Sequence, residues 1–250
     1  MEISEKALKK RFFKQGVYDK LCETTILKVL PGFMDIEKCS IDVGGNVGHI
    51  SYFLAHHSSH VHSYEAVQVV YERLKKLEGM ASNISVYNKA VSNFCGKAEF
   101  FVDHLRLSNS GLQNLGPVDT HFKKVTDFKS VETDVVTIDS MNLKDVGMIK
   151  IDVEGTELDV LKGAKKTIAD QSPDFIIEIF SPFSKCPVGK IFDFLLKRDY
   201  KCYYYDPRGS AGLVHVPDTE TGVKEELENH EVHDADFLFT KKDLSEFLKT

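Results

Sequence analysis

The sequence predicts an α/β fold in which helices cover both faces of a mostly parallel sheet. Short apolar runs typical of strands alternate along the chain with longer segments of helical periodicity. Parallel neighbours need a crossover connection, and a helix is its usual form. Strands as apolar as DFIIEIF at 174–180 are typical of sheets buried on both faces. A glycine-rich stretch, DVGGNVG at 42–48, stands where the first strand passes into a helix.

The first 37 residues are expected to form one or two amphipathic helices that cap the sheet. Apolar side chains recur there near helical spacing, at Leu8, Phe12, Val17 and Leu21. We therefore divide the chain into an N-terminal helical cap, 1–37, and a main domain, 38–250.

The main domain begins with the alternating strands and helices. Strands are expected at 39–43, 60–65, 84–88, 147–153 and 174–180. Helices are expected at 47–57, 67–79, 156–169 and 188–198. Together with strands near the C-terminus, this pattern predicts a seven-stranded, mostly parallel sheet.

Two regions depart from the alternation. Residues 97–137 contain an extra strand, KAEFFVD, then a polar loop and the segment ETDVVTID, and a loop of this length is where a lid over a substrate would lie. The chain ends with KCYYYD, an acidic segment at 218–236 and the strand ADFLFT. Two terminal strands joined by a long loop indicate an antiparallel pair.

Composition narrows the function classes. The formal charge of −6 and the pI near 5.9 give no overall attraction to phosphate, so we expect no nucleic-acid partner. Five widely spaced cysteines without a CxxC pair indicate reduced thiols, with neither a disulfide framework nor a zinc site. The charged N-terminus is unlike a signal peptide, and no apolar run has the ~18 residues of a membrane span. We expect a cytoplasmic protein without membrane contact.

The stretch DVGGNVG is a candidate cofactor turn. Ligands of open parallel sheets lie beyond the carboxyl ends of the strands, where the strand order reverses. Glycines there permit positive φ and let a ligand approach the backbone, although they equally permit a tight turn without a ligand. A dinucleotide fingerprint beginning at Gly44 requires glycines where Asn46 and His49 stand, so the spacing disfavours a nicotinamide cofactor.

The residues around this turn suit S-adenosylmethionine. This cofactor has no pyrophosphate, but it carries a sulfonium and an ammonium group, which carboxylates complement. Asp42 precedes the turn and is placed to meet the ammonium group. Glu65 ends the second strand, at about the ~20-residue separation expected of a ribose-binding acid.

Six segments resemble, in order and approximate spacing, the blocks of the FkbM-type methyltransferases. They are IDVGGNVGHIS, SYEAV, VYNKAVSNFCGKAEF, SNSGL, VVTIDSM and MIKIDVEGTELDVLKGA. The resemblance extends from about residue 39 to 180, with a weaker match at DADFLFT. Gly45 stands where the family usually has Ala, and Ala66 where a Pro is common; neither change removes a group that the chemistry needs.

The resemblance implies a Rossmann-like class I methyltransferase fold with S-adenosylmethionine as cofactor, a seven-stranded sheet with a terminal antiparallel strand, and helices on both faces. It assigns the cofactor's methionine part to the turn and its ribose to Glu65, with Ala66 beside it. It assigns the adenine to the residues after the third strand, and the closing loop to Ser110 and Gly111. The cofactor-binding residues implied are Asp42, Gly44, Asn46, Gly48, Glu65, Ala66, Asn88, Lys89, Ala90, Ser110 and Asp152.

Three carboxylates are candidates for the catalytic proton acceptor. Asp152 and Glu178 stand at the expected ends of the fourth and fifth main strands, and Glu154 lies nearby. Each has a structural alternative: Glu154 or Thr156 could begin the following helix, and Glu178 could pair with a buried lysine. Carboxylates at these two strand ends could also hold Mg²⁺, but no third ligand is clearly placed, so we expect no metal.

The function implied is methyl transfer from S-adenosylmethionine to a hydroxyl of a small molecule or saccharide. The acceptor class rests on the family resemblance alone. Two alternatives remain open: a catalytically silent module that keeps the cofactor pocket, and a nicotinamide-dependent oxidoreductase.

Overall fold

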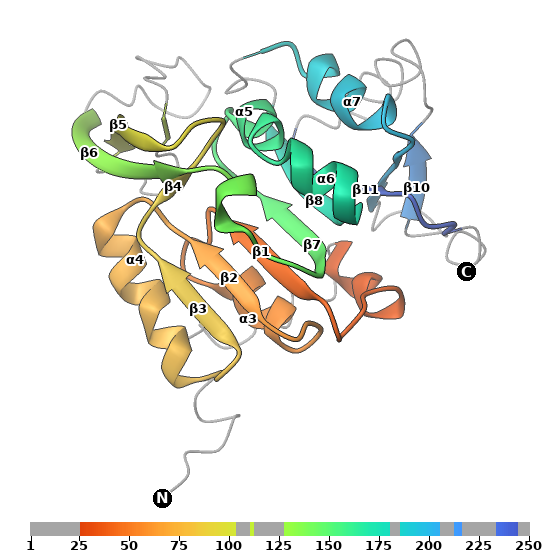
Figure 1. Ribbon diagram of the computed structural model, residues 1–250, viewed down its shortest axis with the longest axis horizontal. Coiled ribbons are helices and arrows are strands. Elements are labelled where there is room, and N and C mark those ends of the chain that lie inside the picture. The colour runs from red at the N-terminus through yellow and green to blue at the C-terminus, as the bar shows by residue number, and fades with distance from the viewer. Residues whose placement is uncertain are drawn as a thin grey trace, which may run out of the picture.

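The computed structural model describes residues 26–103, 111–112, 128–180, 186–205, 213–216 and 234–244 of the 250-residue chain. Its largest element is an eight-stranded sheet with the order β10-β9-β11-β8-β7-β1-β2-β3 (Figure 1). The strands are β1 (Cys39–Val43), β2 (Val61–Tyr64), β3 (Ile84–Tyr87), β7 (Val146–Ile151), β8 (Asp174–Phe180), β9 (Lys201–Tyr205), β10 (Leu213–Val216) and β11 (Asp234–Thr240).

The strand directions confirm a mostly parallel sheet. From β3 to β8 all neighbours are parallel, while β11 is antiparallel to both β8 and β9. The sheet has eight strands where the sequence predicted seven. The additional strand is the short β10, which pairs antiparallel with the outer edge of β9. This strand was not predicted, because its four residues, LVHV, are too few to show a strand pattern and stand in a segment without a recognisable motif.

The extra strand expected after β3 belongs to a separate three-stranded sheet. It contains β4 (Ala90–Val91), β5 (Gly96–Asp103) and β6 (Phe128–Val136), in the order β4-β6-β5. β5 and β6 are antiparallel over eight residue pairs. Figure 1 shows them at one end of the molecule, far from β10. Phe100, Val102 and Val135 pack there against Val67 and Val70, next to and within α4 (Gln68–Leu74).

Helices cover both faces of the main sheet, as expected. α5 (Glu157–Lys162), α6 (Lys165–Gln171) and α7 (Gly189–Leu196) contribute to the apolar core on one face. α3 (His49–Ala55), α4 and the 3-10 helix η3 (Lys75–Gly79) contribute to the core on the other. In this second core lie the 3-10 helices η1 (Ile26–Lys28) and η2 (Leu30–Gly32), with Ile26, Leu27 and Leu30 buried.

Two expected helices are interrupted. The helix expected at 67–79 continues beyond Leu74 as η3. The helix expected at 156–169 divides into α5 and α6 at Gly163, where an added Cβ would lie 2.1 Å from the Ser92 carbonyl oxygen. α6 then begins anew, because the Asp139 carboxylate accepts hydrogen bonds from the backbone N–H groups of Lys166 and Thr167.

The N-terminal helical cap stays a prediction. The four apolar positions that suggested it, Leu8, Phe12, Val17 and Leu21, lie outside the described residues. Of the helices that the structure describes, none has the length and apolar character needed to cross a membrane.

Candidate functional site

The glycine turn lies where the strand order of the main sheet reverses. From β1 the chain runs outward through β2 and β3, and later returns to place β7 on the other side of β1. Gly44 and Gly45 both donate backbone hydrogen bonds to the Tyr64 carbonyl of β2, at 2.9 Å. Asp152 donates its backbone N–H to the Val43 carbonyl, at 3.0 Å. The carboxyl ends of β1, β2 and β7 therefore meet at the turn, which is the usual ligand position of such sheets.

The three glycines of the turn lie close against the protein's own atoms, and Gly44 lies against backbone. Gly44 and Gly48 have φ of 83° and 90°, and Asn46 has φ of 46°. An added Cβ would lie 1.8 Å from the Asp152 carbonyl oxygen at Gly44, 2.2 Å from Ser63 Oγ at Gly45, and 2.3 Å from Leu77 Cδ1 at Gly48. The tight-turn interpretation therefore explains these glycines, and none of them leaves its Cβ position open for a ligand.

Glu65 is tied to this turn. Its Oε2 accepts a hydrogen bond from the Asn46 N–H at 3.0 Å, and its Oε1 accepts one from the Val67 N–H at 2.8 Å. Only 8% of the residue is exposed, and burial raises the pKa of its carboxyl to about 7, against the two backbone donors. Each carboxylate oxygen has capacity for a further hydrogen bond, so the group is suited to two neighbouring hydroxyls.

Asp42 points into the interior. It is 1% exposed, and its Oδ2 accepts a hydrogen bond from Ser51 Oγ of α3 at 2.5 Å. Ser51 is also 2.8 Å from Ser63 Oγ of β2. Burial raises the pKa of Asp42, while the Ser51 hydrogen bond and the charge of Lys150 oppose it. Asp42 thus joins β1 to α3, and its contact with a cofactor ammonium stays a prediction.

The residues proposed for the adenine lie next to Glu65. The Asn88 amide donates to the backbone carbonyls of Glu65 and Ala66, at 2.9 and 3.1 Å, and so fixes the chain after β2. Ala90 begins β4 and is buried, pairing with Val135, and Lys89 stands between it and Asn88. Ser110 lies outside the described residues.

A buried lysine gathers the carboxylates of the neighbouring strands. Lys150 of β7 has 4% of its side chain exposed, and its Nζ lies 3.9 Å from Asp152 Oδ2, 3.5 Å from Glu178 Oε2 and 3.1 Å from Asp236 Oδ1. The carboxylates come from the end of β7, from β8 and from β11, and 28–38% of their side chains is exposed. Glu178 therefore has the lysine partner that the sequence left open, although it lies within β8 and not at its end.

The protonation of this cluster follows from burial and charge. Burial would lower the pKa of Lys150, but Asp236, Asp152 and Glu178 outweigh it and raise the pKa above its ordinary value. Burial and the Asp152 charge raise the pKa of Glu178 to about 7, although Lys150 opposes them. Burial raises the pKa of Asp152 as well, while Lys150 and a hydrogen bond with Glu178 hold it down. Lys150 is thus a fixed cation beside two carboxyl groups whose pKa values are both raised.

The third catalytic candidate, Glu154, stands in a strained part of the backbone. It has φ of 53° and precedes Gly155, with φ of 99°. The start of α5 is served by the buried Glu157, whose Oε1 accepts the Gly155 N–H at 2.7 Å, and by Thr156, whose Oγ1 donates to the Val153 carbonyl at 3.3 Å. Sequence reasoning missed Glu157 in this place.

Sequence reasoning also missed Lys150 and Asp236. A lysine within the apolar run GMIKIDV was a usable signal, because a charge in a buried strand needs a partner. Within the part of the chain that the structure describes, no group of three His, Cys, Asp or Glu side chains is arranged to hold a metal ion. Three carboxylates do meet here, but around the ammonium of Lys150.

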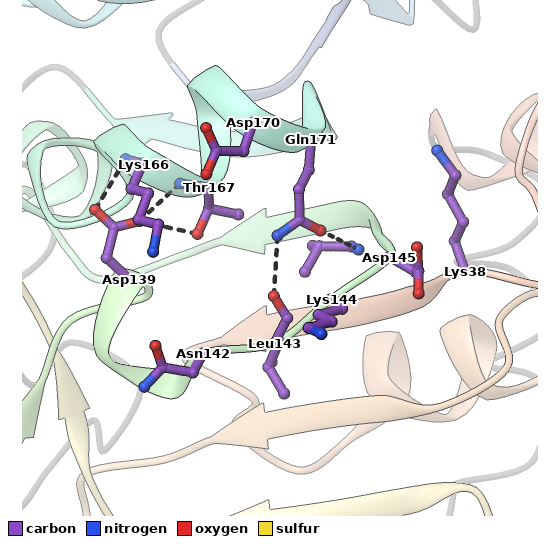
Figure 2. A pocket seen from close by; sticks show the side chains of 11 residues that line it. Lys38, Asp139, Asn142, Leu143, Lys144, Asp145, Lys166, Thr167, Asp170 and Gln171 are labelled. Atoms are coloured by element: carbon purple, nitrogen blue, oxygen red, sulfur yellow. Dashed lines mark hydrogen bonds between the residues drawn. The ribbon is translucent and has the colours of Figure 1, made fainter.

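An open groove of about 590 Å³ lies away from this site, at the amino end of β7 (Figure 2). Its polar groups stabilise the fold. Asp139 binds the first turn of α6, including Thr167 Oγ1 at 2.9 Å. Gln171 accepts from the Val146 N–H at 2.8 Å and donates to the Leu143 carbonyl at 2.9 Å. Because ligands of such sheets lie at the opposite end, we assign this groove a structural role.

Comparison with known families gives one match that covers well over half of the chain. The model of the methyltransferase FkbM domain matches residues 42–202, from Asp42 of the turn through Cys202 of β9. No protein of curated function matches the sequence.

Solved structures resemble this chain at low sequence identity, and one of them exceeds a TM-score of 0.5. The FkbM methyltransferase of Methylobacillus flagellatus has a TM-score of 0.52 and 16% identity, over 83% of this chain and 45% of that one. An rRNA methylase of Streptococcus thermophilus has a TM-score of 0.45 and 10% identity, over 85% of this chain and 90% of that one. SMU.1697c, a methyltransferase candidate of Streptococcus mutans in complex with SAH, has a TM-score of 0.44 and 11% identity, over 85% of this chain and 92% of that one. This chain thus spans under half the length of the M. flagellatus protein.

Proposed function

Because this chain belongs to the methyltransferase FkbM family, whose methyl donor is S-adenosylmethionine, we propose that it transfers a methyl group from this cofactor to a hydroxyl of a small molecule or saccharide. The observation that carries the proposal is the bond between Glu65 and the Asn46 N–H. It places a buried carboxylate with spare acceptor capacity at the glycine turn, beside the reversal point of the sheet.

The residues present fit the cofactor. Glu65 would accept hydrogen bonds from the two ribose hydroxyls, and Asn88, Lys89 and Ala90 would line the adenine. The backbone of the turn, with Asp42, Gly44, Asn46, Gly48 and Asp152, would surround the methionine part. Ala66 would border the ribose, and Ser110, which lies outside the described residues, would belong to the closing loop.

Bound there, S-adenosylmethionine supplies an electrophilic methyl group on a sulfonium that is already a good leaving group. The main task of the protein is therefore to hold the acceptor oxygen in line with the methyl carbon, an orientation effect worth several kcal/mol, ~7 or more in well-oriented systems. As the oxygen forms its bond to carbon and the carbon–sulfur bond breaks, the hydroxyl proton must leave. A carboxylate that takes it contributes roughly 10²–10⁴-fold.

The carboxyl pair of Asp152 and Glu178 is the best-placed proton acceptor. Asp152 directly follows β7, Glu178 lies on the adjacent strand β8, and both side chains are partly exposed. A pKa of about 7 for Glu178 is suited to general base catalysis near neutral pH. Glu154, two residues after Asp152, is the alternative proton acceptor.

We place the enzyme in the cytoplasm, acting without nucleic acid or membrane. Among the described residues, Cys39 and Cys95 are free thiols, which supports a reducing compartment. The net charge of −6 supports a neutral acceptor over a polyanionic one.

Calorimetric titration tests the cofactor. The proposal predicts that S-adenosylhomocysteine binds and NADH does not, and the reverse result would support an oxidoreductase. Transfer of isotope-labelled methyl across a panel of sugars and small alcohols then tests catalysis. A chain that binds S-adenosylhomocysteine but labels no acceptor would be the silent binding module.

A further inference from the structure

Two carboxylates of the cluster face each other directly across two strands. Glu178 of β8 and Asp236 of β11 are register partners in an antiparallel pair. Like charges at such positions lie about 4.5–5.5 Å apart at Cβ and destabilise the sheet. Lys150, on the next strand and the same face, contacts both. The ammonium of Lys150 compensates the two negative charges of Glu178 and Asp236.

The lysine lies below the carboxylates. Its side chain is 4% exposed, against 31%, 38% and 28% for Asp152, Glu178 and Asp236. A ligand approaching from solvent would therefore meet the carboxylates and not the ammonium. Among the described residues, Lys150 Nζ and Asp236 Oδ1 form an ion pair at 3.1 Å and have no further hydrogen-bond partner. Apolar residues of the same volume often give a protein equal stability in place of a buried ion pair. The contribution of this cluster to stability therefore does not by itself explain why charged residues stand here.

We propose that Lys150 is a positioning residue of the methyl transfer. Its ammonium holds Asp152, Glu178 and Asp236 on one face of the sheet, so that Asp236 is the third carboxylate of the site. This role rests on the proposed function. It assigns to the site one residue, Asp236, that comes from the antiparallel strand β11, outside the segment matched by the family model.

The charge on Lys150 decides how the pair titrates. Among the described residues, five acids interact electrostatically with Lys150, and of these Asp236, Asp152 and Glu178 have the largest effect on its pKa. The five acids are Asp42 of β1, Asp152 after β7, Glu157 of α5, Glu178 of β8 and Asp236 of β11. Lys150 lowers the pKa of both members of the pair, whereas Asp236 raises both. Removing the lysine and removing Asp236 must therefore shift the titration in opposite directions.

Carboxyl-carbon NMR titration of the full chain, labelled with ¹³C in Asp and Glu side chains, measures this directly. Glu178→Gln and Asp152→Asn identify the two signals. Lys150→Met should raise the midpoint of the pair by at least about one pH unit, and Lys150→Arg should restore it, because a neighbouring opposite charge shifts a carboxyl by ~1–3 units. Asp236→Asn should lower it. Lys97→Met removes an exposed lysine that pairs with Glu132 and should leave the midpoint unchanged.

Opposite shifts in the two variants support the role, because they show that the charge of Lys150 sets the protonation of the pair. Midpoints that stay within about 0.3 unit of wild type in both variants, or that move in the same direction, overturn it. If Lys150→Met does not fold, the downward shift of Asp236→Asn decides alone. Titration of wild type with S-adenosylhomocysteine separates the two proposals: no binding contradicts the proposed function, while binding with unshifted midpoints contradicts only the role of Lys150.

Discussion

The carboxylate of Glu65 accepts the backbone N–H of Asn46 at 3.0 Å, across 19 residues of sequence. This bond joins the acid after β2 to the turn after β1, so the two parts of the proposed cofactor site are fixed relative to each other. Asn88 fixes the same segment from β3, through the Glu65 and Ala66 carbonyls. These hydrogen bonds within the protein fix the two segments, which would reduce the entropy lost if the proposed cofactor binds between them.

Glu65→Gln should weaken the binding of S-adenosylhomocysteine about 10–100-fold. A neutral amide offers one acceptor oxygen where the carboxylate offers two, and hydrogen bonds to charged groups contribute about 1.5–3 kcal/mol. Calorimetric titration measures the change. Glu72→Gln, an exposed glutamate of the following helix, is the matched control and should bind as wild type does. Equal affinities of the two variants would remove Glu65 from the site.

The affinity for S-adenosylhomocysteine should rise about tenfold between pH 6 and pH 8. Burial raises the pKa of Glu65 to about 7, so the carboxyl is mostly protonated at pH 6. Ribose hydroxyls that donate to the carboxylate favour its ionised form, so the ligand lowers the pKa and binding releases a proton. Titrations in buffers of different ionisation enthalpy would show this proton. A Glu65→Gln chain that keeps the same pH dependence would contradict the assignment to Glu65.

Gly44→Ala should destabilise the fold by about 2–5 kcal/mol. Its φ of 83° is unfavourable for alanine, and the new Cβ would lie 1.8 Å from the Asp152 carbonyl oxygen. Gly79→Ala is the control, since nothing lies within 4 Å of its added Cβ, and its effect should stay within about 1 kcal/mol. Urea unfolding compares the two. A Gly44→Ala chain as stable as wild type would show that the close approach of β1 and β7 is not required.

Asp139→Ala should lower the free energy of unfolding by about 1–2 kcal/mol and leave ligand affinity unchanged. The carboxylate binds the first turn of α6 through three hydrogen bonds, far from the glycine turn. Asp170→Ala changes an exposed aspartate that lines the same groove and should affect neither property. A loss of S-adenosylhomocysteine binding in Asp139→Ala, with the fold intact by circular dichroism, would instead make the groove part of the site.

Most of the fold was predictable, because short strand-like runs such as CSIDV and DFIIEIF alternate with helical patterns. The strand LVHV of β10 is too short to show such a pattern, and the division of α5 from α6 depends on a contact with Ser92, distant in sequence. The β5–β6 pair was recognised as a departure, but its separation from the main sheet depends on tertiary packing against α4.

The candidate site was predictable where neighbours in sequence are neighbours in space. The turn and Glu65 follow consecutive strands, so strand order was enough to bring them together. The Lys150 cluster needs β11 to lie next to β8, and no local pattern specifies that pairing. Asp42 shows the converse: its place in the motif was clear, but its hydrogen bond to Ser51 requires the position of α3.

A crystal structure of the chain with S-adenosylhomocysteine tests the central claim most directly. The account predicts both ribose hydroxyls within about 3 Å of the Glu65 carboxylate, the amino acid part against residues 44–48, and the sulfur facing Asp152 and Glu178. Density for the nucleoside at any other place, such as the groove beside Gln171, with Glu65 still bonded only to Asn46 and Val67, would contradict it.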